Sequence, residues 1–256
     1  MRLDLIFIAY VSAQDPTPGA ALIMKNSVPI LPQAPGYAIG GGLRKIRIDG
    51  CYDLLCDPCN AFHPIFDEFL GLPVSDAKNP GAKTYRNLVT ATFNFFPLPY
   101  HPHSWIANKM TPYLIEQCRQ DAGECRLFKY MEWLRTPDAQ DPEQRAPFEQ
   151  ILDMEDQSED SIVFALVFKH QFVLNPTFGG LDQTILDRVY DPQMGHDWEL
   201  DGRAHWKWCT AMGTAATPSL YVNNQALNDV PFDPQGWKAL VDTLIANQDQ
   251  MAFTQP

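Results

Sequence analysis

Residues 52–64 read YDLLCDPCNAFHP, and this stretch governs how the rest of the chain is interpreted. It holds two cysteines, Cys56 and Cys59, separated by two residues at the expected junction of a strand and a helix. Such a pair can be a redox-active dithiol, half of a zinc site or a structural disulfide. The pair alone leaves these interpretations open, so other parts of the chain have to separate them.

The ligands available for zinc are few. A zinc site needs four ligands, usually from a second CxxC or a histidine pair, and this chain has no second CxxC. Its candidate imidazoles are those of His63, His101 and His103. Thiol–disulfide exchange needs only an attacking thiolate and a second thiol that releases the mixed disulfide. Since a helix N-terminus favours negative charge, Cys56 is the predicted nucleophile and Cys59 the predicted resolving thiol, with no metal and no cofactor.

The two residues between the cysteines have opposite effects. Pro58 is expected to fix the turn that opens the helix. Asp57 is unexpected, because a neighbouring carboxylate disfavours a thiolate.

Composition limits the partners. The 256 residues include 19 basic and 31 acidic side chains, for a net charge of −12. Nucleic acids and anionic membrane surfaces both require clustered Lys and Arg, so the composition argues against them. No stretch approaches the roughly 20 apolar residues that cross a bilayer. The sequence therefore predicts a globular protein with no nucleic-acid partner and no membrane span, and it leaves the oligomeric state open.

The N-terminus and the other cysteines bear on the compartment. Residues 1–13 fit a short signal peptide, and an edge strand or a disordered lead is the alternative. Cys118 and Cys125 flank a short polar stretch and are either a local disulfide or two unrelated thiols. Cys51 and Cys209 are the remaining possible pair, while Cys51 by itself is a third redox thiol or a buried apolar residue. The secretory pathway or the extracellular space is favoured, with the cytoplasm as the alternative.

The order of expected elements points to one small sheet interrupted by helices. A strand is predicted at Leu43–Ile48, ending near Asp49 and Gly50, and a helix follows Cys59 with a kink at Pro64. Further strands are expected at Tyr85–Phe96 and Ser219–Asn223. Every convincing pattern in residues 104–212 is helical. The chain then closes with an Asn223-Asn224 hairpin turn and a helix capped by Asp233.

A second diagnostic stretch is GTAATPSLYVNNQAL, residues 213–227, where Pro218 directly precedes the strand. Proline cannot donate a hydrogen bond to a strand ladder, so its position needs an explanation. One alternative is a cis Thr217–Pro218 bond, which exposes the Thr217 backbone to a substrate strand. The other is a trans proline that starts an edge strand.

Together, the CxxC and the distant Thr-Pro resemble the thioredoxin superfamily, and most of all its DsbA-like branch. The segment FFPLPYHPHSWIANKM (95–110) is similar to a eukaryotic thioredoxin-like subset that carries PLPYH, as is FALVFKHQ (164–171). The resemblance covers roughly residues 35–247. It implies an α/β protein with a thioredoxin-like fold and an all-helical insertion.

This resemblance divides the chain into four parts. Residues 1–34 form an N-terminal lead that includes the possible signal peptide. Residues 35–103 form the first half of the thioredoxin-like core with the CxxC. Residues 104–212 form the helical insertion. Residues 213–256 form the second half of the core, with the cis-proline loop and the C-terminal helix.

The resemblance also assigns roles. Cys56, Cys59 and Pro218 take the catalytic positions, and Thr217, Asp57 and Pro58 the substrate-contacting ones. Asp53, three residues before the first cysteine, matches a D-x-x-C pattern and is a candidate proton relay.

The sequence also departs from the family pattern. The histidine of the usual Cys-Pro-His-Cys is absent, and Gly50 occupies the place of a buried acidic residue, with Asp49 one residue out of register. His101 and His103 are expected to face solvent, to support the proline turn or to lie beside the active site. The tryptophans of the insertion (Trp105, Trp133, Trp206 and Trp208) are expected in the core.

The function that follows is thiol–disulfide exchange with protein, peptide or small-thiol partners, glutathione included. A less oxidising couple than that of the branch's strong oxidants is expected, and the direction of exchange stays open. The alternative is a non-catalytic thioredoxin-like module that binds extended peptides. A third interpretation, a kappa-type glutathione transferase or isomerase, needs a serine near the end of the first strand, and residues 49–60 contain none.

Overall fold

The computed structural model describes residues 33–120, 125–137, 143–154, 156–158, 161–162, 189–190 and 196–254. The possible signal peptide, and most of the predicted helices between residues 159 and 190, lie outside the described residues. The described strands are β1 (Tyr37–Ile39), β2 (Ile46–Tyr52), β3 (Val89–Phe95), β4 (Ser219–Val222) and β5 (Gln225–Ala226). The described helices are α2 (Asp57–Gly71), α3 (Tyr85–Leu88), α4 (Ser104–Gln120), α5 (Leu127–Arg135), α6 (Pro147–Leu152), α9 (His196–Ala211) and α10 (Pro234–Thr254).

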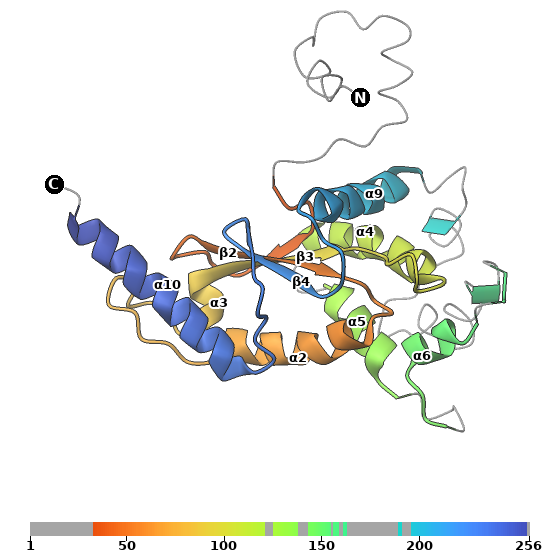
Figure 1. The fold of residues 1–256 in the computed structure, drawn as a ribbon, viewed down its shortest axis with the longest axis horizontal. Helices are drawn as coiled ribbons and strands as arrows, with labels where there is room; N and C mark the ends of the chain where they lie inside the picture. Colours follow the sequence, from red (N-terminus) through yellow and green to blue (C-terminus); the bar gives the residue numbers. More distant parts are fainter. Residues whose placement is uncertain are drawn as a thin grey trace, which may run out of the picture.

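The strands form one mixed sheet in the order β1-β3-β2-β4-β5. The strands β2 and β3 are parallel and are joined through α2 and α3, while the other three pairs are antiparallel. Helices α2 and α10 cover one face of the sheet, and α4 and α9 cover the other (Figure 1). All described helices of the insertion fall between β3 and β4 in sequence. The chain therefore has an α/β thioredoxin-like fold with a helical insertion between β3 and β4.

Two predicted strands have different bounds in the structure. The first begins at Ile46 instead of Leu43 and continues past Gly50 to Tyr52. It continues because every residue to Tyr52 pairs with β3, a long-range interaction that the local pattern does not contain. The segment predicted as a strand from Tyr85 opens instead with the helical turn α3. The side chain of Asn87 caps this turn by accepting a hydrogen bond from the backbone N–H of Thr84.

The predicted turn and cap near the C-terminus are confirmed. Asn223 and Asn224 both have positive φ and form the two-residue turn between β4 and β5. Asp233 accepts a hydrogen bond from the backbone N–H of Gly236 at 2.7 Å and so caps α10.

Helix α2, where the sequence predicts a kink at Pro64, continues through this residue from Asp57 to Gly71.

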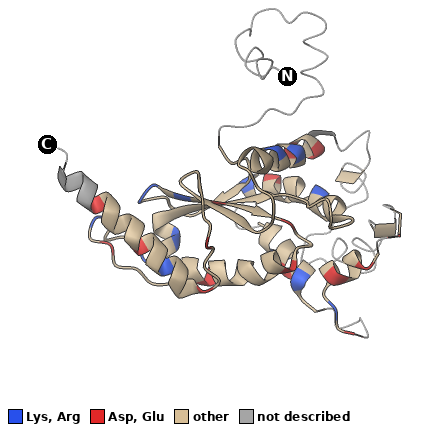
Figure 2. Cartoon of the chain, in the orientation of Figure 1, with Lys and Arg blue, Asp and Glu red and all other residues tan. Residues whose placement is uncertain are grey.

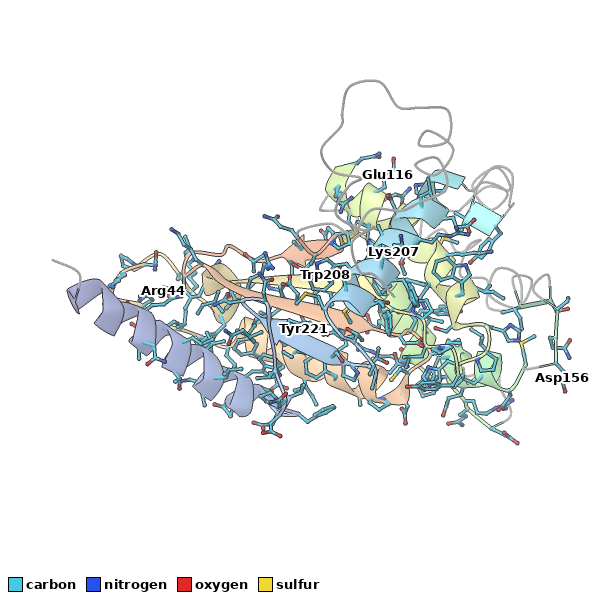
Figure 3. All side chains as sticks on the ribbon, turned by 45° about the horizontal axis from the view of Figure 1, so that its top comes forward. Arg44, Glu116, Asp156, Lys207, Trp208 and Tyr221 are labelled. Carbon is cyan, nitrogen blue, oxygen red and sulfur yellow. A yellow bond between two sulfur atoms is a disulfide. The ribbon has the colours of Figure 1, made fainter. Side chains whose placement is uncertain are left out.

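Aromatic packing holds α2 and α10 against the sheet. Trp237 of α10 is fully buried and makes an edge-to-face contact with Phe66 of α2, with ring centroids 5.0 Å apart. On the other side of β2, Trp208 of α9 packs against Tyr221 of β4 near the centre of the molecule (Figure 3). Aromatic packing thus fixes α2, the helix that follows the CxxC turn, against the sheet.

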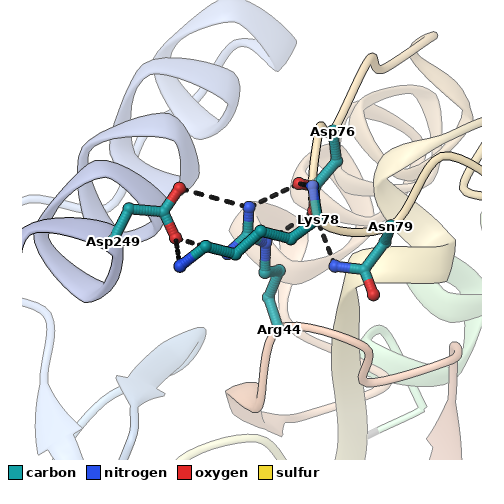
Figure 4. A network of polar contacts seen from close by, with 5 residues as sticks. All are labelled: Arg44, Asp76, Lys78, Asn79 and Asp249. Carbon is teal, nitrogen blue, oxygen red and sulfur yellow. Dashed lines mark hydrogen bonds and ion pairs between the residues drawn. The ribbon is translucent and has the colours of Figure 1, made fainter. Parts of the chain in front are cut away.

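Arg44 joins three segments at the end of the molecule remote from α4 and α9. Its guanidinium donates to the carboxylates of Asp76, in the loop after α2, and of Asp249 in α10 (Figure 4). Lys78 also pairs with Asp249, at 2.7 Å. Elsewhere, acidic and basic residues are interspersed along the helices (Figure 2). Among the described helices, none combines the length and apolar composition that a membrane crossing requires.

Candidate active site

The two thiols lie at the N-terminus of α2, directly after β2. Cys56 is the N-cap residue, and Cys59 falls in the first helical turn. Asp57 and Pro58 occupy the first two helical positions and are exposed. Proline is tolerated there because the first N–H groups of a helix have no intrahelical partner. Cys56 and Cys59 are both free thiols and both are buried.

The Thr-Pro segment lies beside the CxxC. The Thr217–Pro218 peptide bond is cis, which is one of the two forms that the sequence left open. The thiol of Cys56 donates to the backbone carbonyl of Thr217, at a distance of 3.3 Å. The two segments are 161 residues apart in sequence, and they meet because β4 pairs with β2, placing Ser219 opposite Cys51.

The pKa values of the two thiols are shifted in opposite directions. A hydrogen bond from Cys59 is the main cause that lowers the pKa of Cys56 to about 6. Burial and the negative charge of Asp53 oppose this lowering. The pKa of Cys59 is raised, first by burial and then by its interaction with Cys56. The pair therefore holds one thiolate, on Cys56, at neutral pH.

Asp53 is fully buried and holds the turn that precedes the CxxC. Its carboxylate accepts hydrogen bonds from the backbone N–H groups of Leu55 at 2.8 Å and Leu98 at 2.7 Å. The hydroxyl of Ser104 donates to it, and Nδ1 of His101 lies 2.9 Å from it. Its own backbone carbonyl accepts the N–H of Cys56 at 3.2 Å. Asp53 therefore links the CxxC turn to the loop between β3 and α4.

Gly50 and Asp49 are consecutive residues of β2, so their positions face opposite sides of the sheet. A Cβ atom on Gly50 would lie 2.2 Å from the ring of Tyr52, so this buried ring fills the space beside Gly50. The side chain of Asp49 lies on the face opposite to Gly50, and its carboxylate accepts a hydrogen bond from Arg47 at 2.7 Å. Burial raises the pKa of Asp49. Asp49 thus has a structural partner of its own on the face of the sheet opposite α2.

All four remaining cysteines form disulfides, Cys51 with Cys209 and Cys118 with Cys125. The first joins β2 to α9 across 158 residues, and the second closes a local loop across seven. Of the alternatives left open for Cys51, the structure shows the pairing with Cys209: α9 brings Cys209 against it, so Cys51 is fully buried but is not a third redox thiol. In the described part of the chain, no group of three or more candidate metal ligands gathers.

The loop between β3 and α4 also lines a cavity of about 420 Å³ together with α9. His101, Trp105, Arg203 and Trp206 are among the lining residues. Trp206 is 40% exposed, so the prediction that it belongs to the core is wrong; Trp208, two residues later, is buried. His101 bonds Asp53, which places it one contact from the CxxC turn, whereas His103 bonds the backbone carbonyl of Met154.

The sequence did not indicate that Ser104 bonds Asp53 or that the ring of Tyr52 fills the space beside Gly50. Ser104 is the first residue of α4, and its hydroxyl bonds a carboxylate 51 residues away. Tyr52 appeared only as a residue of the CxxC stretch. A polar residue directly after the proline-rich segment is a signal that could have drawn attention to Ser104.

Comparisons with known proteins find similar solved structures but no related sequence. No family model matches the chain, and no curated protein matches its sequence. Among solved structures, it is similar to a putative protein-disulfide isomerase from Pseudomonas syringae, with 14% identity, a TM-score of 0.49, and coverage of 79% of this chain and 95% of that one. A periplasmic thioredoxin-like protein from Salmonella enterica serovar Typhimurium matches with 13% identity, a TM-score of 0.47, and coverage of 85% and 94%. BdbD from Bacillus subtilis matches with 13% identity, a TM-score of 0.47, and coverage of 83% and 94%.

Proposed function

We propose that the protein is a thiol–disulfide oxidoreductase in which Cys56 attacks and Cys59 resolves. The observation that supports this best is the Cys56 thiol at the N-terminus of α2, in contact with the carbonyl before a cis-proline and with a pKa of about 6. At neutral pH such a group is mostly thiolate, while Cys59 keeps its proton.

The exchange proceeds in two displacements. The Cys56 thiolate attacks one sulfur of a partner disulfide, so that a Cys56–partner bond forms and the other partner sulfur leaves as a thiolate. Cys59 then loses its proton and attacks the sulfur of Cys56, which releases the second partner thiol. The partner gains two electrons, and the protein keeps a Cys56–Cys59 disulfide. The reverse sequence oxidises a partner dithiol.

The partners in this proposal are protein, peptide or small thiols, glutathione included. The backbone carbonyl of Thr217 lies 3.3 Å from the sulfur of Cys56, so Thr217 and the following Pro218 would contact the partner chain beside the scissile bond. Asp57 and Pro58 are exposed at the rim and would contact residues flanking the partner cysteine. Asp53 stays a candidate proton relay, since its charge acts on Cys56.

We also propose a secretory or extracellular location. The structural disulfides Cys51–Cys209 and Cys118–Cys125 support it, because such bonds persist mainly in oxidising compartments. Detection of the protein in the secreted fraction or secretory compartments would agree with this location, and an exclusively cytosolic signal would contradict it.

An insulin-reduction assay on wild type, Cys56→Ser and Cys59→Ser tests the activity. Cys56→Ser should abolish reduction, and Cys59→Ser should accumulate a mixed disulfide with the substrate because the resolving thiol is missing. A non-catalytic peptide-binding module would instead give equal rates in wild type and Cys56→Ser, intact peptide binding in both, and no trapped complex with Cys59→Ser. The direction of exchange follows from the equilibrium of the 56–59 pair in glutathione buffers, measured by mass after thiol alkylation.

A further inference from the structure

His101 contacts the carboxylate that adjoins the thiol site. Nδ1 of His101 lies 2.9 Å from Oδ2 of Asp53, whose side chain is completely buried. His101 itself is 20% exposed and lines the cavity of about 420 Å³ described above. Its ring therefore reaches solvent through this cavity while it contacts a buried carboxylate.

The backbone carbonyl of Asp53 accepts the N–H of Cys56 at 3.2 Å, so the carboxylate lies close to the thiol and its negative charge disfavours the Cys56 thiolate. Burial keeps the carboxylate out of water, so its field is weakly screened. Among the groups that bond this carboxylate in the described part of the chain, the N–H groups of Leu55 and Leu98 and the hydroxyl of Ser104 are neutral. The imidazole of His101 is the one that can carry a positive charge.

We propose that His101 is a positioning residue for thiol–disulfide exchange, whose protonated ring offsets the charge of Asp53 and thereby favours the Cys56 thiolate. This inference rests on the proposed function. It assigns to a loop residue the electrostatic role that a histidine between the two cysteines would have, since those positions hold Asp57 and Pro58 here.

In the described part of the chain, three other titratable side chains line this cavity or contact His101. Arg203 of α9 lines the same cavity but pairs with Glu199 on its own helix. His103 lies two residues further along the loop and bonds a backbone carbonyl instead of Asp53. Tyr100 packs edge-on against the His101 ring, with centroids 5.0 Å apart. Of these groups, only His101 touches the Asp53 carboxylate.

The test compares His101→Gln with wild type. Glutamine retains a hydrogen-bond donor for Asp53 but cannot be charged. The pKa of Cys56, followed by thiolate absorbance and by the rate of iodoacetamide alkylation, should rise by about one unit when the opposing charge is lost. Because the wild-type pKa is about 6, the alkylation rate at pH 6 should fall about fivefold, and the rate at pH 9 should not change. His103→Gln is the matched control and should leave both rates unchanged.

Three results would overturn the inference. The first is a Cys56 titration in His101→Gln that coincides with wild type. The second is a shift of equal size in His103→Gln. The third is a shift in His101→Ala that His101→Gln fully restores, which would make the contact a matter of hydrogen bonding alone. Wild-type titration of Cys56 near pH 6 together with an unchanged variant would refute only this inference, whereas a wild-type protein without a reactive thiol would refute the proposed function as well.

Discussion

Removing the disulfide between Cys51 and Cys209 should destabilise the protein more than removing any other single covalent constraint in the described residues. This bond joins β2 to α9 across 158 residues, so it closes a very long loop of the unfolded chain. The bond between Cys118 and Cys125 spans only seven residues and offers a matched control within the same molecule. The perturbation is the pair of double variants Cys51→Ala/Cys209→Ala and Cys118→Ala/Cys125→Ala.

The magnitude follows from the entropy of loop closure. For 158 residues the chain-entropy relation gives about 5 kcal/mol at 25 °C, and for seven residues it gives about 2 kcal/mol. Both Cys51 and Cys209 are fully buried, so truncation to alanine also leaves unfilled space and adds to the loss. The long-loop variant should therefore lose about 3 kcal/mol more free energy of unfolding than the short-loop variant.

Equilibrium unfolding in urea measures this difference, with Cys56 alkylated in every protein so that it cannot exchange with the disulfides. The midpoint should fall further for Cys51→Ala/Cys209→Ala than for the control, and far-ultraviolet and tryptophan signals should report a single transition in each. Equal losses in the two double variants would refute the argument from loop length. A separate early transition of the tryptophan signal would instead show that the bond secures only the contact between α9 and the sheet.

Three further predictions concern acid stability, packing and thiol reactivity. Arg44 holds the pKa of Asp76 at about 2, below the unfolded value of about 3.9, so stabilisation present above pH 4 is lost on acidification. Lowering the pH from 5 to 2 should remove about 2 kcal/mol of free energy of unfolding through the Asp76 carboxylate. In Asp76→Asn, the free energy of unfolding should change less over this pH range, and a pH dependence parallel to that of wild type would contradict the prediction. Gly50→Ala should lower the free energy of unfolding by about 1–3 kcal/mol because its Cβ would strike the buried ring of Tyr52, and unchanged thermal stability would disprove the clash. Alkylation of Cys56 should follow a single titration with a midpoint near pH 6, and a midpoint above pH 8 would contradict the lowered pKa.

Several features were predictable from sequence because they depend on neighbours in the chain. The helix that opens at the CxxC follows from Pro58 and the apolar spacing after it, and the turn at Asn223-Asn224 follows from residues that tolerate positive φ. The cap at Asp233 requires only a side chain three residues before the N–H that it bonds. Such interactions act within a few residues and leave a local pattern.

The rest was decided by contacts between distant segments. The pairing of Cys51 with Cys209, the end of β2 at Tyr52 and three of the four partners of the Asp53 carboxylate all depend on where β3, α4 and α9 pack. Asp49 and Asp53 are both acidic residues close to the CxxC in sequence, yet Asp49 pairs with Arg47 and Asp53 holds the turn before the CxxC. The chain alone determined that two thiols open a helix. Only the tertiary structure, by burying a carboxylate beside them and setting His101 against it, decided their electrostatic environment.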